Sequence, residues 1–360
     1  MTPLEILAAI ASRPPRIAVL GDCMLDGWWS GHVERLAREA PVPVLDLEQK
    51  RSTPGGAANT ARNLAALGAE VLAIGVLGMD EAGTQLRGRL RDAGVDVSRL
   101  RRSPGGRTTT KVRVSASDGM VLRLDETQRS EWPEAARRAL VADTAGTVDG
   151  SDAQLFCDYG SSTLSDDVIA GIAGQPRPAL RVVDAHRPER WAPVRPDVVT
   201  PNSAEAEHLV GRPLGAGEER IEQVERSANA LLEAASAASA VVTLDRSGTV
   251  LLGHGAPHRT RARPVSERRA SGAGDVFVAA LTAALTVGAP VRDAVDFAQH
   301  AADAAVHGRG RFTCALEGPD FLRRWLLAAN GEQVPGRGRG GARGRGAHES
   351  AQDRGAMRVP

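Results

Sequence analysis

The residues best suited to chemistry form the segment Ser271-Gly272-Ala273-Gly274-Asp275, which directly precedes an apolar, alanine-rich run over residues 276–287. The run predicts a helix, so a turn of small residues opens onto a helix N-terminus. Glycines allow backbone N–H groups to close around an anion, and the helix terminus adds unpaired N–H groups and a positive dipole end. Asp275 lies at the mouth of this predicted anion site, where a carboxylate is a sensible base for an attacking hydroxyl.

These groups together indicate phosphoryl transfer. The amides of Gly272, Ala273 and Gly274 would hold developing negative charge while Asp275 prepares the nucleophile. The alternative is a glycine-rich turn whose aspartate only caps the next helix, since short glycine patterns are common. The other motifs of the chain decide between the two.

Two aspartates follow the first predicted strand. Residues 16–20 predict a buried strand, and Asp22 and Asp26 come just after it, where open α/β sheets place their ligands. Asp26 could accept hydrogen bonds from sugar hydroxyls. Both aspartates could also simply cap a turn.

A glycine pair precedes the next predicted helix, over residues 60–67. Gly55 and Gly56 allow a ligand to approach the backbone closely, and Asn59 is placed to hydrogen-bond that ligand. A plain turn with a capping residue explains the same pattern almost equally well.

Asn202 and Glu205 stand three residues apart at the start of a helix predicted over 204–210. This spacing is typical of a capping box, in which Asn202 caps the helix and Glu205 reaches back. The same pair would place an amide and a carboxylate at the ligand edge of a sheet, where Mg²⁺ and its waters could bind. The local pattern favours the cap.

Alternating strands and helices along most of the chain predict the α/β class, with a mostly parallel sheet covered by helices on both faces. Residues 42–48, 107–114 and 119–124 break the alternation and predict a small antiparallel sheet outside the main layer. Such a sheet could act as a lid or as the surface of a homodimer.

Further along, residues 218–237 predict one long helix and residues 257–265 an edge strand. We expect one domain over residues 1–330. Residues 331–360 are rich in Arg and Gly and almost free of apolar side chains, which predicts a disordered tail.

Composition excludes several classes of function. A formal net charge of +1 offers no general attraction to nucleic acid or acidic membranes, and no apolar run approaches the ~20 residues of a membrane span. The three cysteines lie far apart, so neither a disulfide framework nor a zinc site is expected, and we predict a cytoplasmic protein. The Arg/Gly tail could bind RNA, but a solvated tail is the simpler interpretation.

In this order, the motifs resemble the ribokinase-like (PfkB) family of carbohydrate kinases over residues 15–328. Residues 55–59 match its N-terminal signature, residues 202–205 its Asn-x-x-Glu motif and residues 271–275 its Gly-Ala-Gly-Asp signature. Three motifs in order along an alternating chain are far more specific than any one alone. The resemblance implies a ribokinase-like fold with a β lid and an ATP-dependent sugar kinase.

One branch of the family is especially similar, the heptose-7-phosphate kinase domain of the enzymes that make ADP-heptose. Segments 21–26, 39–44, 54–59, 110–113 and 122–125 carry this similarity. Members phosphorylate the anomeric hydroxyl of D-glycero-β-D-manno-heptose 7-phosphate. The resemblance therefore implies a sugar or sugar phosphate, ATP and Mg²⁺ as ligands.

The resemblance also implies roles for individual residues. Asp275 is the expected catalytic base, beside the anion-hole amides of Gly272, Ala273 and Gly274. The residues expected to hold the sugar or its phosphate are Asp22, Asp26, Gly55, Gly56, Asn59, Lys111 and Arg113. The residues expected around ATP and Mg²⁺ are Asn202, Glu205, Thr243, Asp245 and Gly248, with Glu205 acting on the metal through water.

Three positions depart from the family pattern. Arg269 stands where an Asp usually helps to bind a monovalent cation, which an arginine cannot ligate, so activity without potassium is expected. Ser161 and His186 replace lysines that could hold phosphates. Either the substrate lacks a distal phosphate, or arginines such as Arg187 substitute, or catalysis is impaired.

Two alternatives to a heptose-phosphate kinase therefore stay open. One is a kinase for an unphosphorylated sugar. The other is a non-catalytic sugar- or nucleotide-binding protein of the same fold, which the departures favour. Retention of Asp275, the anion-hole glycines, Asn202 and Glu205 favours catalysis.

Overall fold

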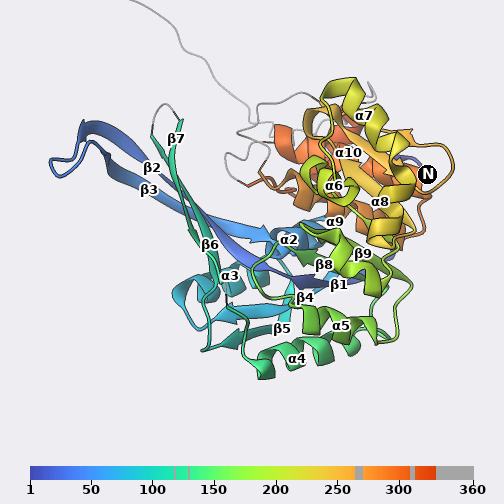
Figure 1. The fold of residues 1–360 in the computed structure, drawn as a ribbon, viewed down its shortest axis with the longest axis horizontal. Coiled ribbons are helices and arrows are strands. Elements are labelled where there is room, and N and C mark those ends of the chain that lie inside the picture. Colours follow the sequence, from blue (N-terminus) through green and yellow to red (C-terminus); the bar gives the residue numbers. More distant parts are fainter. Residues whose placement is uncertain (117–118, 129, 264–270, 309–312, 330–360) are drawn as a thin grey trace, which may run out of the picture.

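The computed structural model describes residues 1–116, 119–128, 130–263, 271–308 and 313–329. In these residues, helices flank one large sheet, and a second, smaller sheet projects away from it (Figure 1). The predicted α/β class is confirmed. Arg269, residues 117–118 of the predicted lid turn and the Arg/Gly tail lie outside the described residues.

The large sheet has nine strands in the order β13-β12-β11-β10-β9-β8-β1-β4-β5. Neighbouring strands from β11 to β5 in that order pair in parallel, whereas β12 and β13 are antiparallel additions at one edge. The strands are β1 (Arg16–Gly21), β4 (Glu70–Gly78), β5 (Asp96–Ser103), β8 (Ala153–Asp158), β9 (Leu180–Ala185), β10 (Val198–Val199), β11 (Ser239–Thr243), β12 (Thr249–Leu252) and β13 (His258–Arg259).

Each face of this sheet carries its own apolar core, because successive strand residues point to opposite faces. In β1, Ile17 and Val19 pack into one core, and Ala18 and Leu20 into the other. The first core includes side chains of α1 (Pro3–Ser12), α2 (Ala57–Leu67), α3 (Glu81–Asp92), α9 (Ala273–Thr286), α10 (Val291–His307) and α11 (Pro319–Ala329). The second includes α4 (Glu134–Ala145), α5 (Asp166–Ala173), the 3-10 helix η1 (Pro188–Val194), α6 (Ser203–Val210), α7 (Gly217–Arg226) and α8 (Ala228–Ala235).

The small sheet is larger than the sequence predicts. It has four strands in the order β3-β2-β6-β7, namely β2 (Cys23–Leu36), β3 (Pro43–Gly56), β6 (Thr109–Ala116) and β7 (Gly119–Glu126). The residues of β2 carry no strand signal because glycines and charged residues interrupt their pattern. Tertiary pairing with β3 on one side and β6 on the other extends it over 14 residues.

Other differences are local. The predicted helix over 218–237 is two helices, α7 and α8, which meet at Ser227. Strand β13 covers only two residues of the predicted edge strand over 257–265. Helix α2 begins at Ala57 rather than near residue 60, which makes Asn59 a helical residue.

The parallel strands bring the residues that follow β1, β8, β9, β10 and β11 to the same edge of the sheet. The N-termini of α2 and α9 meet at this edge, where an Asn59–Asp275 hydrogen bond joins them. In the part of the chain that the structure describes, every helix is too short or too polar to cross a membrane.

Candidate active site

The N-terminus of α9 is built as the sequence predicts. Gly272 is the N-cap residue at φ +86°, and no side chain caps the helix. A Cβ on Gly272 would lie 2.6 Å from Thr313 Cγ2 and 2.8 Å from Asn59 Nδ2, so glycine is required there. The outer side of Gly274 is open. The first-turn N–H groups of this helix are therefore available for an anion.

Asp275 lies in the first turn of α9 and is partly accessible. Its Oδ2 accepts a hydrogen bond of 2.7 Å from Asn59 Nδ2, and the same amide group donates to the carbonyl of Cys314 at 3.2 Å. Asn59 is fully buried in α2. The structure therefore brings two of the predicted site residues, from opposite ends of the domain, into direct contact.

The pKa of Asp275 is raised to about 7, mainly by burial and also by the nearby carboxylates Asp184 and Asp26, whereas the Asn59 hydrogen bond and the Arg62 charge lower it. A carboxylate with this pKa is partly deprotonated near neutral pH and has a strong affinity for a proton. Both properties suit a general base.

Asp26 is buried next to this pair, on β2. Its Oδ1 lies 3.2 Å from Arg113 Nη1, and its Oδ2 accepts a hydrogen bond of 3.3 Å from Thr313 Oγ1. A Cβ on Gly55 would lie 2.7 Å from the Asp26 carboxylate. Thus Gly55 makes room for Asp26, and the guanidinium of Arg113 stacks over the ring of Trp28 on the same face of the lid.

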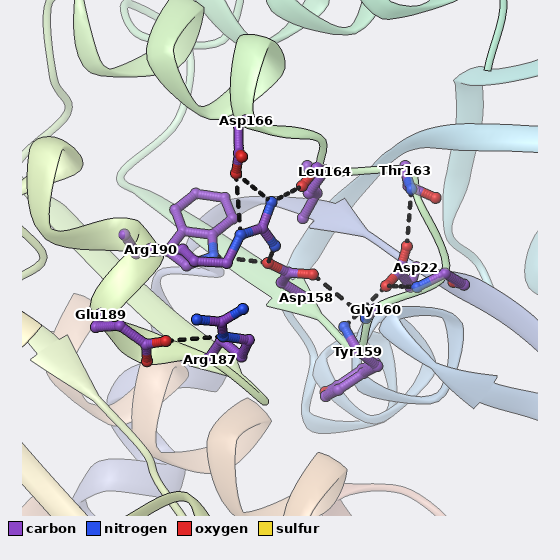
Figure 2. A network of polar contacts seen from close by, with 12 residues as sticks. Asp22, Asp158, Tyr159, Gly160, Thr163, Leu164, Asp166, Arg187, Glu189 and Arg190 are labelled. Carbon is purple, nitrogen blue, oxygen red and sulfur yellow. Dashed lines mark hydrogen bonds and ion pairs between the residues drawn. The ribbon is translucent and has the colours of Figure 1, made fainter. Parts of the chain in front are cut away.

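Asp22 contacts the loop that follows β8. Its side chain is buried, and its carboxylate accepts N–H bonds from Tyr159 at 2.8 Å, Ser161 at 3.0 Å and Thr163 at 3.3 Å (Figure 2). Asp22 therefore stabilises this loop, and its role in sugar binding stays a prediction. Gly56, at φ +54°, packs against the Asp22 carbonyl and the Tyr159 ring.

A second set of contacts fixes the same loop from its other side. The guanidinium of Arg190 donates to Asp158 Oδ2, to Asp166 Oδ1 and to the carbonyl of Leu164 at 2.8–2.9 Å (Figure 2). Trp191 Nε1 also donates to Asp158. The loop between β8 and α5 is thus held rigidly beside the site.

The residues predicted around the nucleotide, except Glu205, line a cavity of about 600 Å³. Its lining joins the N-terminus of α9 to the turn between β11 and β12, and includes Asn202, Thr243, Asp245, Gly248, Ala273 and Gly274. The size and mixed lining fit a nucleotide whose phosphates approach the helix N-terminus.

Asn202 and Glu205 form the capping box that their spacing favours. Asn202 Oδ1 accepts the Glu205 N–H, and Glu205 Oε2 accepts the Asn202 N–H. The second carboxylate oxygen of Glu205 lies 2.8 Å from His186 Nδ1, a contact that raises the pKa of His186. Glu205 is also not part of the cavity lining.

Both oxygens of Glu205 are engaged by these contacts. The described residues contain no group of three or more His, Cys, Asp or Glu side chains that could hold a metal. The role of Glu205 on the metal through water stays a prediction. Mg²⁺ commonly binds through substrate phosphates rather than through a protein cage, so we treat it as part of the nucleotide substrate.

The two residues that replace family lysines, Ser161 and His186, make other contacts. Ser161 is buried under the Asp22 carboxylate. His186 is paired with Glu205, and Arg187 is paired with Glu189 on an exposed surface. Lys111 forms no hydrogen bond or ion pair within the described residues, and its charge acts on His186 across the site.

Four further residues reach the site and were missed in the sequence. Tyr159 donates to Asp184 at 2.5 Å, and burial raises the pKa of Asp184 to about 6. Arg62 contacts Asn59, and Thr313 contacts Asp26. The spacing of Asn59 and Arg62, one helical turn apart, and the presence of only one tyrosine in the chain were usable signals. Asp184 stands near the end of a strand at the ligand edge of the sheet, which was also a usable signal, whereas Thr313 offered none.

The uncapped N-terminus of α9 and the Asp275 carboxylate lie together at the edge where the parallel strands end. This arrangement suits an α/β kinase for small hydroxyl compounds. The chain matches the model of the pfkB family of carbohydrate kinases over residues 15–317 and belongs to that family. It is a sugar kinase with a ribokinase-like fold, as the sequence motifs imply.

Curated relatives support this assignment. The chain is 35% identical over 320 residues to the bifunctional protein HldE of Pseudomonas paraeruginosa and 36% identical over 321 residues to that of Azotobacter vinelandii. Each alignment covers 88% of this chain and 65% of the relative. The chain therefore spans about two thirds of the length of these relatives.

Solved structures show the same fold. Phosphofructokinase-2 from Escherichia coli in complex with substrates and products matches 88% of this chain and 99% of its own, with a TM-score of 0.70 and 20% identity. Ribokinase from Arabidopsis thaliana complexed with ribose and ATP matches 87% and 99%, with a TM-score of 0.65 and 19% identity.

The raised pKa of Asp275 predicts a cost to stability. A folded-state pKa of about 7 lies above the unfolded value near 4, so the cost is absent below about pH 4 and grows as pH rises towards 7. Asp275→Asn should therefore unfold at higher urea concentration than wild type at pH 8, and the difference should shrink towards pH 5.

Asp320→Asn is the matched control, because Asp320 is an exposed aspartate in the first turn of α11. It should not show this pH-dependent gain. A gain of the same size for both variants would contradict the raised pKa of Asp275.

Proposed function

We propose that this kinase transfers the γ-phosphoryl group of Mg·ATP to the anomeric hydroxyl of D-glycero-D-manno-heptose 7-phosphate, giving the 1,7-bisphosphate. The contact between Asn59 and Asp275 at the uncapped N-terminus of α9 is the observation that carries the reaction type. The similarity to the HldE proteins over 88% of the chain supports the heptose substrate.

The proposed mechanism uses three parts of the site. The nucleotide binds in the cavity with its phosphates at the first turn of α9, and the sugar binds between Asp26 and Asp275 beneath the lid. Asp275 takes the hydroxyl proton as the sugar oxygen forms its bond to the γ-phosphorus and the bond to the bridging oxygen of ADP breaks. The amides of Gly272, Ala273 and Gly274 stabilise the charge on the transferring group.

Lys111 supports a phosphorylated substrate. It is paired with Asp26 in the register of β2 and β6, so it lies on the face of the lid that carries Asp26 and Arg113. Arg113 is already neutralised by Asp26. An unneutralised ammonium group on this face is suited to a distal phosphate.

A kinase for an unphosphorylated sugar is the second candidate. It is favoured by the loss of lysine at two positions, Ser161 and His186, where heptose kinases carry this residue. Ser161 is buried and His186 is paired with Glu205, so neither offers a free cation to a phosphate.

The outer face of the lid suggests self-association. Leu47, Leu122 and Leu124 are each more than 40% exposed, and the sheet register places Trp29 and Val112 on the same face as Leu122 and Leu124. An apolar sheet face of this kind is unfavourable in water. We propose that a second copy of the chain covers it in a symmetric dimer.

The first prediction concerns the base. Asp275→Asn should lower kcat about 10²–10⁴-fold in an ADP-release assay with Mg·ATP and the heptose phosphate, since the hydroxyl loses its proton acceptor. In wild type, kcat/KM should rise with pH through about 7, because Asp275 must be deprotonated. Asp320→Asn serves again as the control, and full activity of Asp275→Asn would refute the mechanism.

The second prediction concerns the distal phosphate. Lys111→Met should lower kcat/KM for the heptose phosphate about 10–100-fold, the cost of one charge-assisted hydrogen bond, and should change that for the unphosphorylated heptose little. The control is Lys50→Met, the only other lysine, which lies over Trp29 on the outer face. Equal losses with both sugars would favour the second candidate.

The third prediction concerns the dimer. Wild type should have twice the chain mass in size-exclusion chromatography with light scattering, and Leu122→Asp should be a monomer. Arg123→Ala, at a position paired with Arg113 on the opposite face of β7, is expected to remain dimeric. A monomeric wild type at micromolar concentration would exclude this interface.

A further inference from the structure

Arg62 is a charged residue of the site that no motif assigns. It lies on α2, one turn after Asn59, and is half-buried. Its Nη2 donates a hydrogen bond of 2.6 Å to Asn59 Oδ1. The guanidinium therefore lies behind the amide that contacts Asp275, on the side away from the carboxylate.

Four contacts agree on the orientation of the Asn59 amide. Its oxygen accepts from Arg62 and, at 3.2 Å, from Asn63 Nδ2. Its nitrogen donates to Asp275 Oδ2 and to the carbonyl of Cys314. A flipped amide would place its oxygen against two acceptors and its NH₂ group against two donors, so the donors behind Asn59 fix which group faces Asp275.

This orientation also distinguishes the two oxygens of Asp275. Oδ2 is held by the Asn59 N–H bond. A proton from a substrate hydroxyl is therefore accepted best by Oδ1, whose lone pairs face no such donor from Asn59. The direction in which the base faces its substrate thus depends on a chain of contacts that begins at Arg62.

We propose that Arg62 is a positioning residue for the phosphoryl transfer: it fixes the Asn59 amide in the orientation that donates to Asp275, and its charge balances the carboxylates that crowd the site. The inference rests on the proposed function of Asp275 as the base. Arg62 itself does not touch the reacting atoms.

The charge matters because the surroundings of Asp275 are acidic. Among the described residues, the titratable and charged groups that act on Asp275, or on which it acts, are Asp26, Arg62, Cys157, Tyr159, Asp184 and Cys314. Asp184 and Asp26 raise the pKa of Asp275, whereas Arg62 lowers it. Cys157, Tyr159 and Cys314 have raised pKa values themselves and stay neutral near pH 7.

A purely structural role does not account for this arginine. Asn63 already gives the Asn59 oxygen a neutral donor. The Nε of Arg62 is buried without a hydrogen-bond partner among the described residues, and burial lowers the pKa of Arg62. Such a group costs stability, so what Arg62 adds beyond Asn63 is its positive charge.

The test is the pH dependence of kcat/KM for Arg62→Gln and Arg62→Lys with Mg·ATP and the heptose phosphate. Arg62→Gln should move the acidic limb upward by about one pH unit, because an opposite charge near the base is lost. The loss at pH 6 should then exceed that at pH 9 by about tenfold. Arg62→Lys keeps the charge and should bring the limb most of the way back.

Arg87→Gln is the matched control. Arg87 is a half-buried arginine of α3 whose Nη2 donates to the Val97 carbonyl at 3.2 Å, and whose Nε also lacks a partner in the described residues. It belongs to no part of the site. Its substitution should leave the acidic limb in place.

A second measurement needs no activity. The stabilisation that Asp275→Asn gives against urea should be larger at pH 8 in the Arg62→Gln background than in wild type, since the carboxylate there has lost its nearby cation. This double-mutant cycle tests the electrostatic role of Arg62 separately from the proposed kinase function. If the cycle shows coupling but no sugar is phosphorylated, the proposed function fails while the electrostatic role of Arg62 stands.

Two outcomes would overturn the inference. One is an acidic limb that stays in place in Arg62→Gln while the rate falls equally at every pH, as expected for a structural role alone. The other is a urea cycle without coupling between Arg62 and Asp275.

Discussion

The hydrogen bond between Asn59 and Asp275 is the contact on which the rest of the site depends. It joins two helix N-termini that lie 216 residues apart in the chain. A half-buried carboxylate such as that of Asp275 is stabilised by a hydrogen-bond donor. The fully buried Asn59 amide in turn needs hydrogen-bond acceptors. Two neighbouring hydrogen bonds, from Asn59 to the Cys314 carbonyl and from the Leu316 N–H to Asn63, join α2 to the segment that contains Cys314 and Leu316. The two halves of the domain thus meet where the chemistry is expected.

The charged groups around the Asn59–Asp275 contact suit the proposed catalysis more than they favour stability. Burial raises the pKa of Asp275 to about 7 and that of Asp184 to about 6, so the fold tolerates two carboxylates that prefer to bind protons. The surroundings compensate with fixed donors, such as Tyr159 and Thr200 on Asp184. Similar rigidity comes from Asp22 and Arg190, which hold the loop after β8 from two sides. Proteins commonly accept such local costs at active sites.

The two faces of the small sheet carry different kinds of side chain. Side chains alternate between its faces, so Asp26, Lys111 and Arg113 share the face towards the site while Trp29 and the exposed leucines share the other. The inner face is polar and carries positive charge, which suits the proposed sugar phosphate, and the outer face is apolar, which suits the proposed dimer. The parallel pairing of β2 with β6 sets this register, since a slip of one residue would exchange the faces.

The sequence alone determined the fold class, the family and the short motifs: the uncapped turn before α9, the glycine pair before α2 and the capping box at Asn202. These features depend on backbone conformation and spacing over a few residues, which the sequence shows directly. Tertiary structure decided which side chains meet. It placed the Asp22 carboxylate against the loop after β8 and paired Glu205 with His186. It also extended β2 into the small sheet and brought Arg62 and Thr313 to the site. Those partners come from segments far apart in the chain, and their contacts arise only because buried polar groups must find donors and acceptors once the sheet has assembled.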